Sequence, residues 1–504
     1  MRHRILLAAS LLYLCVANIV WIRIDTRPPF WDMAGHASWS LAVLRDFQEH
    51  GAAALKTLPN VSPGYPPLYY VIVAAAYRLL GSSIDTAQLA NMPAIILLGL
   101  ATYGIARSLL NPMGAAIAAV LVNFFPMMLW ISRETLIETW LTAMVAVALW
   151  ALIKTKNFSN PRWSLVFGFL CGLGMLTKWT FTIFVALPAL WSARKHWSNA
   201  FKAAAIAALL ASYWYIPRLS SMIQLWNQAA VASQSEGDPG FFSLQGWIFY
   251  IRALEGSLLL LPLFLAFLAG VVAVLRRPSN LSNWTPIALS LIGGWLGLML
   301  LPNSDPRYAT GALPAVAIVT AAAFERSALA QAALIVFLIF QHVLVSFGIS
   351  SLPERIMLSR GNGGVVSYDW NVYTQNYFGL WGKPMREDWQ IDRVLQRVSS
   401  ESSGTVRVGL IPDLPRFDQP AFQFAVDLKH YPVVVTRQFA TDVSSLLSND
   451  YLLMSLGEQS AFGSPAPHAE EINTFILDHA ERFRIADEFS LPNGEMIRLY
   501  RCVR

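Results

Sequence analysis

The chain has 504 residues, of which 55% are hydrophobic and only 13% are charged. Soluble globular proteins carry roughly 25% charged residues, so this composition excludes an ordinary soluble enzyme with a single core. A mean hydropathy of +0.46 predicts that most of the chain lies in lipid and crosses the bilayer many times. The cysteines Cys15, Cys171 and Cys502 are too few and too scattered for a disulfide framework or a cysteine metal site.

Apolar segments recur from residue 5 to residue 350, and a bilayer crossing needs about 17–25 helical residues. We predict eleven spans: 5–22, 87–106, 113–132, 138–153, 163–177, 179–193, 200–217, 246–275, 284–302, 309–324 and 328–350. The first apolar segment is alternatively a signal peptide, but it lacks a clear small-residue cleavage pair, so we predict an anchor. Residues 65–80 are apolar but short, and we expect an interfacial or re-entrant element there.

The charged residues between these segments sort by side. Residues 1–350 contain 22 lysines and arginines against 12 aspartates and glutamates, whereas residues 351–504 contain 15 against 19. The loops predicted on the cytoplasmic side share a strong basic excess: Arg2, Arg4, Arg107, Lys154, Lys156, Arg162, Arg194, Lys195, Lys202, Arg276, Arg277 and Arg326, against Glu325 alone. This pattern predicts a cytoplasmic N-terminus. Residues 163–193 could alternatively form one long tilted helix instead of two short ones. That arrangement would reverse the side of every later loop and place Arg276 and Arg277 on the outer side of the membrane.

The basic excess does not form a stripe interleaved with aromatic residues on a polar domain, so we expect no nucleic-acid partner. The sequence divides into a membrane domain at 1–350, with outer loops 23–86 and 133–138, and a soluble domain at 351–504. In the soluble domain, strand-like runs occur at 405–411, 431–436 and 451–455. The runs at 484–490 and 495–502 flank Pro492-Asn493-Gly494 and predict a hairpin. We expect an extracytoplasmic α/β domain.

The first outer loop contains Asp32 and His36, close to Phe30 and Trp31. Partial desolvation beside aromatic rings raises the pKa of a carboxyl group and makes it a better general base. Asp32 and His36 are four residues apart, so on a helix they share one face and could form a dyad or half of a divalent metal site. The simpler alternative is that Asp32 caps a helix beginning near Met33.

Further ionisable residues fall at the predicted outer surface. In the second outer loop, Arg133, Glu134 and Glu138 flank the boundary of two apolar segments, where a charge is costly unless it is paired or solvated. A salt bridge that pins the loop is the alternative to a functional role. Lys178 lies between two short apolar helices, where it either snorkels to the headgroups or binds an anionic lipid phosphate.

The segment Asp305-Pro-Arg307-Tyr308 precedes the penultimate span. An arginine at the start of an outer helix adds donors beside free helix N–H groups, which favours phosphate binding. An ordinary interfacial arginine is the alternative. Gln341 and His342 are polar residues within the last span, where a neighbouring helix is their commonest partner.

This order of landmarks resembles the GT-C glycosyltransferases, in particular the protein mannosyltransferase and aminoarabinose transferase branch with its RgtA/B/C/D-like relatives. The residues that carry the resemblance, over 1 to about 325, are Asp32, Pro66-Pro67-Leu68-Tyr69-Tyr70, Arg133 with Glu138, Gly172 to Lys178, and Arg307-Tyr308 with Pro314. Two positions depart from the family pattern. Met33 replaces a second carboxylate, and Tyr65 replaces a histidine before the Pro-Pro pair.

The resemblance implies a polytopic α-helical membrane enzyme of GT-C type in the bacterial inner membrane. It implies that Asp32 is the catalytic base, that Glu138 and Arg133 shape the second loop, and that Lys178 and Arg307 hold the donor phosphate. The substrate-binding set is then His36, Tyr65, Arg133, Glu134, Lys178, Asp305, Arg307 and Tyr308. The resemblance does not determine whether the enzyme needs a divalent metal ion.

Nucleotide sugars are cytoplasmic, so outer-face sugar transfer needs a donor carried through the bilayer, such as a polyprenyl phosphate sugar. We therefore expect an inverting transfer to an envelope glycan, lipid or protein acceptor. A transporter or flippase of a lipid-linked or small polar substrate is the main alternative, although it predicts charges near the membrane midplane. A third possibility is a protein without enzymatic activity that uses its outer domain as a scaffold to bind partners.

Overall fold

The computed structural model describes residues 1–236, 238–239, 243–276, 281–348, 355–360, 364–369, 382–401, 404–460, 466 and 468–503. The chain forms two compact units. The first unit comprises Met1–Trp21, His50–Ile72 and Gln88–Lys383, and the second comprises Ile22–Glu49, Val73–Ala87 and Pro384–Arg504. The predicted domain boundary at 350 lies outside the described residues.

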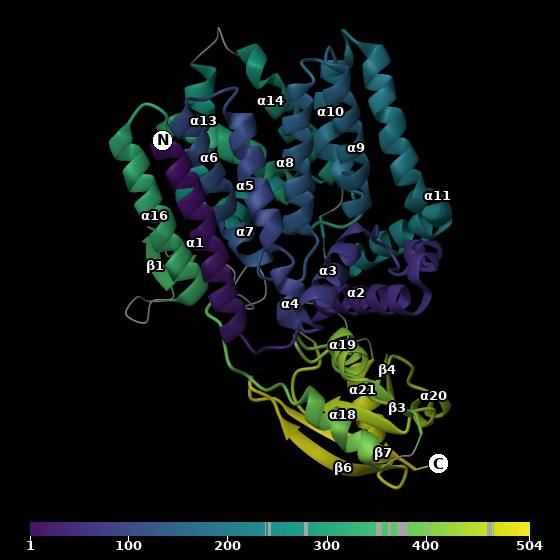
Figure 1. Cartoon of the computed structure of the whole chain (residues 1–504). Coiled ribbons are helices and arrows are strands. Elements are labelled where there is room, and N and C mark those ends of the chain that lie inside the picture. The colour runs from purple at the N-terminus through teal and green to yellow at the C-terminus, as the bar shows by residue number, and fades with distance from the viewer. Residues whose placement is uncertain are drawn as a thin grey trace. The chain divides into compact units, whose positions relative to one another are not determined.

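The first unit is a helical bundle (Figure 1). Its helices, including those shared with the second unit at their ends, are α1 (Arg2–Ile24), α3 (Leu68–Leu80), α4 (Ile84–Leu89), α5 (Met92–Ala106), α6 (Pro112–Phe124), α7 (Pro126–Ile131), α8 (Glu138–Lys154), α9 (Pro161–Thr177), α10 (Phe181–Ala193), α11 (Trp197–Glu236), α12 (Leu244–Ala253), α13 (Leu260–Leu275), α14 (Leu281–Met299), α15 (Leu313–Phe324) and α16 (Ala328–Phe347). Shorter pieces are η1 (Gly51–Lys56), η2 (Leu58–Asn60), η3 (Leu254–Leu259) and η5 (Pro306–Ala312), and a hairpin joins β1 (Arg355–Arg360) to β2 (Gly364–Asp369).

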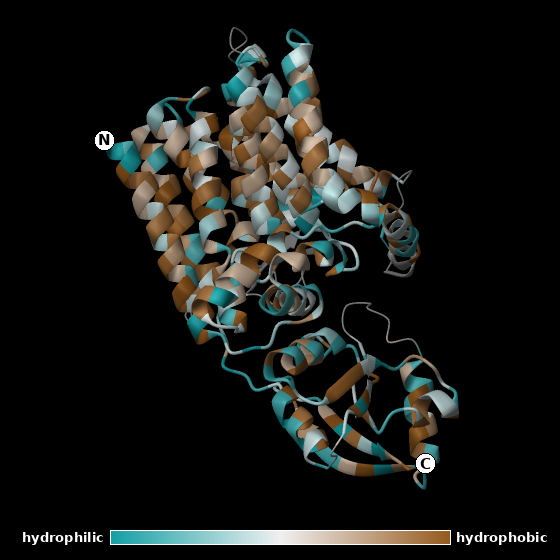
Figure 2. Cartoon of the chain, turned by 45° about the vertical axis from the view of Figure 1, so that its right-hand side comes forward, coloured by the Kyte–Doolittle hydropathy of each residue, from teal (hydrophilic) through white to brown (hydrophobic). Residues whose placement is uncertain are grey.

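The described residues contain six helical stretches long and apolar enough to cross a bilayer: Arg2–Ile24, Ile84–Ala106, Trp197–Val231, Leu244–Leu275, Pro306–Phe324 and Ala328–Phe347. Each of the eleven predicted segments is largely helical, but several are short or interrupted, so the number of spans stays a prediction. Figure 2 shows hydrophobic residues along these helices and hydrophilic residues gathered near their ends. The protein is an integral membrane protein.

Three predicted helix boundaries were wrong, for identifiable backbone reasons. The span at 113–132 breaks at Phe125, because Pro126 cannot continue the hydrogen-bonding of α6. The span at 246–275 contains a π-helical segment, η3, which is followed by Leu260 at a φ of 64°. The helix at 200–217 continues through Pro217 to Glu236, and Arg218 donates to Asn60 Oδ1 at 3.2 Å.

Glycines allow the closest helix contacts of this unit. A Cβ added at Gly168 of α9 would collide with the Ala203 carbonyl of α11, and one at Gly270 of α13 would collide with the Val319 carbonyl of α15. Lipid supplies no hydrophobic force between helices, so close backbone packing at small residues stabilises the bundle.

The second unit contains a five-stranded mixed sheet of order β4-β3-β5-β7-β6. The strands are β3 (Val406–Leu410), β4 (Val433–Arg437), β5 (Tyr451–Ser455), β6 (Phe483–Ser490) and β7 (Met496–Cys502). All five predicted strands are therefore confirmed. β3 pairs in parallel with β4 and β5, whereas β7 runs antiparallel to β5 and β6. The hairpin turn contains Gly494 at φ 90°, as the Pro-Asn-Gly sequence predicts.

Helices cover both faces of this sheet (Figure 1). One core contains residues of α18 (Ile391–Ser400) and α19 (Gln419–Lys429), and the other contains residues of α20 (Val443–Leu447) and α21 (Ala469–Asp478). The same unit includes α2 (Trp31–His50) and the segment before it. Thr26 donates its amide to the Met385 carbonyl at 2.9 Å, so the C-terminal chain binds this segment directly.

Candidate functional site

The centre of the candidate site in the first unit is an ion pair inside the protein. Lys178 Nζ lies 2.7 Å from Glu138 Oε1, and the two side chains are only 2% and 4% exposed. Glu138 is the first residue of α8, and Lys178 directly follows α9. A buried cation of this kind does not snorkel to the headgroups, so that alternative for Lys178 is wrong.

Two tyrosines complete the surroundings of the lysine. The ammonium lies 4.5 Å from the ring centroid of Tyr308 and 5.9 Å from that of Tyr65, both within cation–π range. We call Tyr65, Glu138, Lys178 and Tyr308 the Lys178 cluster. Its members come from four separate stretches of the chain, and the sequence analysis had selected all four.

The cluster continues into the segment before α15. Tyr308 accepts a hydrogen bond on its hydroxyl from Asn303 Nδ2 at 3.0 Å. Its neighbour Arg307 forms an ion pair with Asp305, with 2.8 Å between Nη2 and Oδ2. Asp305 also accepts the Arg307 amide at 2.7 Å and so caps η5. The fold thus places the segment carrying Arg307 beside Lys178.

The second outer loop is buried and rigidly held. Arg133 is 1% exposed and its guanidinium lies 4.6 Å from the ring centroid of Trp21. Asn91 donates to the Glu134 carbonyl at 2.7 Å, and Asn18 donates to Ser132 Oγ at 3.0 Å. These contacts fix the loop that leads into Glu138.

Asp32 and His36 belong to the second unit, where both lie on α2. The helix begins at Trp31, so Asp32 lies inside the first turn and the prediction of a cap before Met33 is wrong. A carboxylate in the first turn is stabilised by the positive end of the helix. His36 is buried and contacts the Trp39 ring edge-on at 5.4 Å. Within the described ranges, no group of three or more His, Cys, Asp or Glu residues is placed to hold a metal ion.

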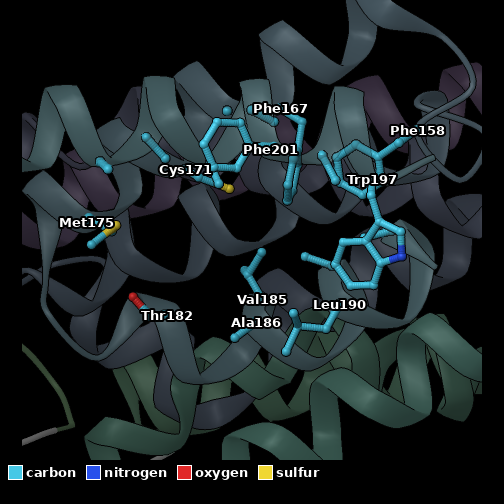
Figure 3. Close-up of a pocket in the computed structure, with 18 of the residues that line it drawn as sticks. Phe158, Phe167, Cys171, Met175, Thr182, Val185, Ala186, Leu190, Trp197 and Phe201 are labelled. Atoms are coloured by element: carbon cyan, nitrogen blue, oxygen red, sulfur yellow. The ribbon is translucent and has the colours of Figure 1, made fainter. Parts of the chain in front are cut away.

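A separate apolar pocket of about 420 Å³ lies among α9, α10 and α11 of the first unit (Figure 3). Phe158 and Trp197 lie toward one end of it, and Met175 and Thr182 toward the other. Phe181 also lines the pocket, and its amide donates to the Lys178 carbonyl at 3.0 Å. The pocket therefore begins within one turn of the Lys178 cluster.

The fold matches solved structures over nearly its whole length. ArnT from Cupriavidus metallidurans matches with TM-scores of 0.58 bound to undecaprenyl phosphate and 0.59 in the apo state, at 11% and 13% identity, and each match covers 98% of this chain and 97% of that one. The chain has the GT-C fold. The fold that the sequence resemblance implied is therefore confirmed.

A more distant match is the oligosaccharyltransferase AglB from Archaeoglobus fulgidus, in complex with an inhibitory peptide and a dolichol-phosphate. Its TM-score is 0.54 at 12% identity, over all of this chain and 74% of that one. The family model described as dolichyl-phosphate-mannose-protein mannosyltransferase matches residues 64–220. No curated protein matches the chain significantly. The matched stretch includes Tyr65, Glu138 and Lys178.

Several residues that shape these sites were missed by the sequence analysis. Trp21 is buried in α1 and Asn91 at the start of α5, and only their contacts show that they hold the second loop. Asp413 and Asp418 of the C-terminal domain bind the segment before Asp32. No sequence signal linked them to it, because they lie more than 380 residues away.

Proposed function

We propose that the protein is a membrane glycosyltransferase that moves a sugar from a polyprenyl phosphate donor to a cell-envelope acceptor on the outer face. The observation that carries this proposal is the buried Lys178–Glu138 pair beside the Asp305–Arg307 pair, in a chain with the GT-C fold. Two cations, of which Lys178 lies close to two aromatic rings, suit a ligand with one anionic group and a sugar. The donor phosphate is such a group.

The two cations act when the glycosidic bond breaks. The leaving group is a polyprenyl phosphate anion, and its charge grows in the transition state. Lys178 and Arg307 stabilise this charge because they are fixed in advance and largely shielded from water. Glu138 and Asp305 keep the cations oriented before the phosphate arrives. Tyr65 and Tyr308 line the space around the ammonium.

Asp32 is the proposed general base. It removes the proton of the acceptor hydroxyl while the sugar carbon is attacked from the side opposite the phosphate. A single displacement of this kind inverts the anomeric centre and leaves no sugar covalently bound to the protein. His36, one helical turn further along α2, is proposed to contact the substrate on the same helix face.

The pocket shown in Figure 3 is proposed to receive part of the polyprenyl chain. Its lining is almost entirely apolar, and Leu190, Trp197 and Phe201 on its rim are exposed on the helix surfaces, where lipid reaches them. It begins next to Lys178, the proposed phosphate ligand. A lipid whose phosphate binds Lys178 has its first isoprene units at this position.

Filling the pocket should discriminate between long and short lipid carriers. We expect Ala200→Phe, at the end of the pocket lined by Trp197, to weaken binding of undecaprenyl phosphate roughly threefold to tenfold, because in lipid the pocket contributes packing rather than a hydrophobic gain. Farnesyl phosphate, which extends less far, should bind with unchanged affinity. Ala205→Phe on the same helix, outside the lining, is the matched control. Equal weakening of both lipids would contradict the assignment.

The overall function is tested by comparing cell-envelope glycans by mass spectrometry with and without the protein. We expect one sugar residue to disappear from one class of envelope molecule and to return on complementation. Accumulation of the sugar-loaded polyprenyl phosphate should accompany its loss. Unchanged envelope glycans, combined with a defect in moving the lipid carrier across the membrane, would instead establish a flippase.

A further inference from the structure

The segment directly before Asp32 is bound by the C-terminal part of the second unit. Arg416 Nη1 donates to the Pro28 carbonyl at 2.8 Å, and its guanidinium lies 5.0 Å from the ring centroid of Phe30. The Trp31 amide donates to Asp418 Oδ2 at 3.2 Å, and the indole Nε1 donates to Asp413 Oδ1 at 3.2 Å. Both hydrogen-bond donors of Trp31, the amide and the indole N–H, are thus bound by carboxyl groups from one loop.

This loop occupies a particular place in the sheet topology. It follows β3, which lies between β4 and β5. The chain passes from β3 to β4 on one side and then crosses to β5 on the other, so the strand order reverses at β3. Open α/β sheets bind their ligands at this point, beyond the carboxyl ends of the strands. Here Pro28, Phe30 and Trp31 of the same chain are bound there.

The loop is rigid and already ordered by the sheet. Asp413, Arg416 and Asp418 are each less than 5% exposed. Asp413 pairs with Arg437 at the end of β4, and Asp418 caps α19 by accepting the Ala421 amide at 2.8 Å. Burial raises the pKa of Asp418 to about 8. The acceptors that bind Trp31 therefore have fixed positions.

Trp31 itself adopts a backbone conformation that it would not adopt alone. Its φ is 42°, which is strained for a bulky side chain and persists only where surrounding contacts hold it. Asp32 is the next residue, in the first turn of α2. The backbone of Trp31 therefore sets the direction in which the Asp32 side chain leaves the helix.

We propose that Asp413, Arg416 and Asp418 are positioning residues for Asp32, and that the C-terminal α/β domain serves as a clamp for the catalytic base. This inference rests on the proposed function, because it takes Asp32 as the base. The clamp acts by holding Trp31 in its strained conformation, and it makes no contact with the reacting atoms.

Two variants test the clamp while changing as little as possible. Trp31→Phe keeps an aromatic ring but removes the indole N–H, and Asp413→Ala removes the carboxyl group that accepts it. Asp442→Asn is the matched control, since Asp442 caps α20 in the same domain. Three quantities are measured on the full chain: hydrogen exchange of the Phe30, Trp31 and Asp32 amides, affinity for undecaprenyl phosphate, and sugar transfer to the acceptor identified by the glycan comparison.

For both variants we expect hydrogen exchange of the Phe30, Trp31 and Asp32 amides to rise at least about threefold and transfer to fall roughly tenfold. Undecaprenyl phosphate should bind within about twofold of wild type, since the base is misplaced while the phosphate ligands are intact. The double variant Trp31→Phe with Asp413→Ala should be little worse than the single variants, because the two residues share one hydrogen bond. The control should change none of these quantities.

Other outcomes overturn the inference in distinguishable ways. Unchanged exchange of the Phe30, Trp31 and Asp32 amides in both variants would show that the clamp does not hold this segment. Faster exchange with normal transfer would show that the clamp does not position the base. If Asp32→Asn itself transfers sugar normally, the proposed role of Asp32 fails, and the clamp then has no catalytic meaning even where exchange responds.

Discussion

Replacing Asp32 with asparagine should reduce sugar transfer by roughly 100-fold to 10,000-fold, the usual contribution of a general base. The amide keeps the size of the side chain and still suits the first turn of α2, but it cannot take up the acceptor proton. Transfer is measured in membranes as sugar incorporated into the acceptor per amount of protein. The affinity for undecaprenyl phosphate should be unchanged.

The control for this variant is Glu49→Gln, at an exposed carboxylate near the other end of the same helix. It should leave transfer within about twofold, as surface substitutions away from a site usually do. Full activity of Asp32→Asn at normal protein level would remove Asp32 from the role of base. The base would then have to be another acidic residue, and substitutions of the acidic residues of the first unit would be tested in the same assay.

Breaking the Lys178–Glu138 pair should have the second large effect. Lys178→Ala leaves the Glu138 carboxylate buried without its cation, which typically costs about 3–5 kcal/mol of stability. It should also weaken binding of undecaprenyl phosphate at least about tenfold, because a charge-assisted contact to phosphate contributes about 1.5–3 kcal/mol. Both quantities are measured on the purified protein in detergent or nanodiscs.

A double variant separates the two effects. Lys178→Met with Glu138→Gln removes both charges at similar volume, so the fold should recover much of its stability while phosphate binding stays weak. Lys429→Ala breaks an exposed pair with Asp392 and should affect neither quantity. Normal affinity for undecaprenyl phosphate in the double variant would exclude Lys178 as a phosphate ligand.

The sequence by itself was sufficient for the helical membrane part and for the strands of the C-terminal sheet. Apolar stretches follow from the cost of exposing polar backbone to lipid, and this signal is local. The runs at 405–411 and 451–455 and the turn at Gly494 are likewise local patterns, and each was confirmed. Glu138 and Lys178 were selected because ionisable residues at membrane boundaries need partners, whereas Tyr65 and Tyr308 were selected through the family resemblance.

Only the tertiary structure decided which partner each residue has. Lys178 pairs with Glu138 rather than with the headgroups, because the ends of α8 and α9 bring their side chains together inside the bundle. The helix containing Pro217 continues because it packs against the loop that holds Asn60, a contact over more than 150 residues. The strain at Trp31 depends on Asp413 and Asp418, which the β3 loop brings next to it. Local sequence patterns carry no information on such distant contacts, because these form only when the sheet and the bundle have folded.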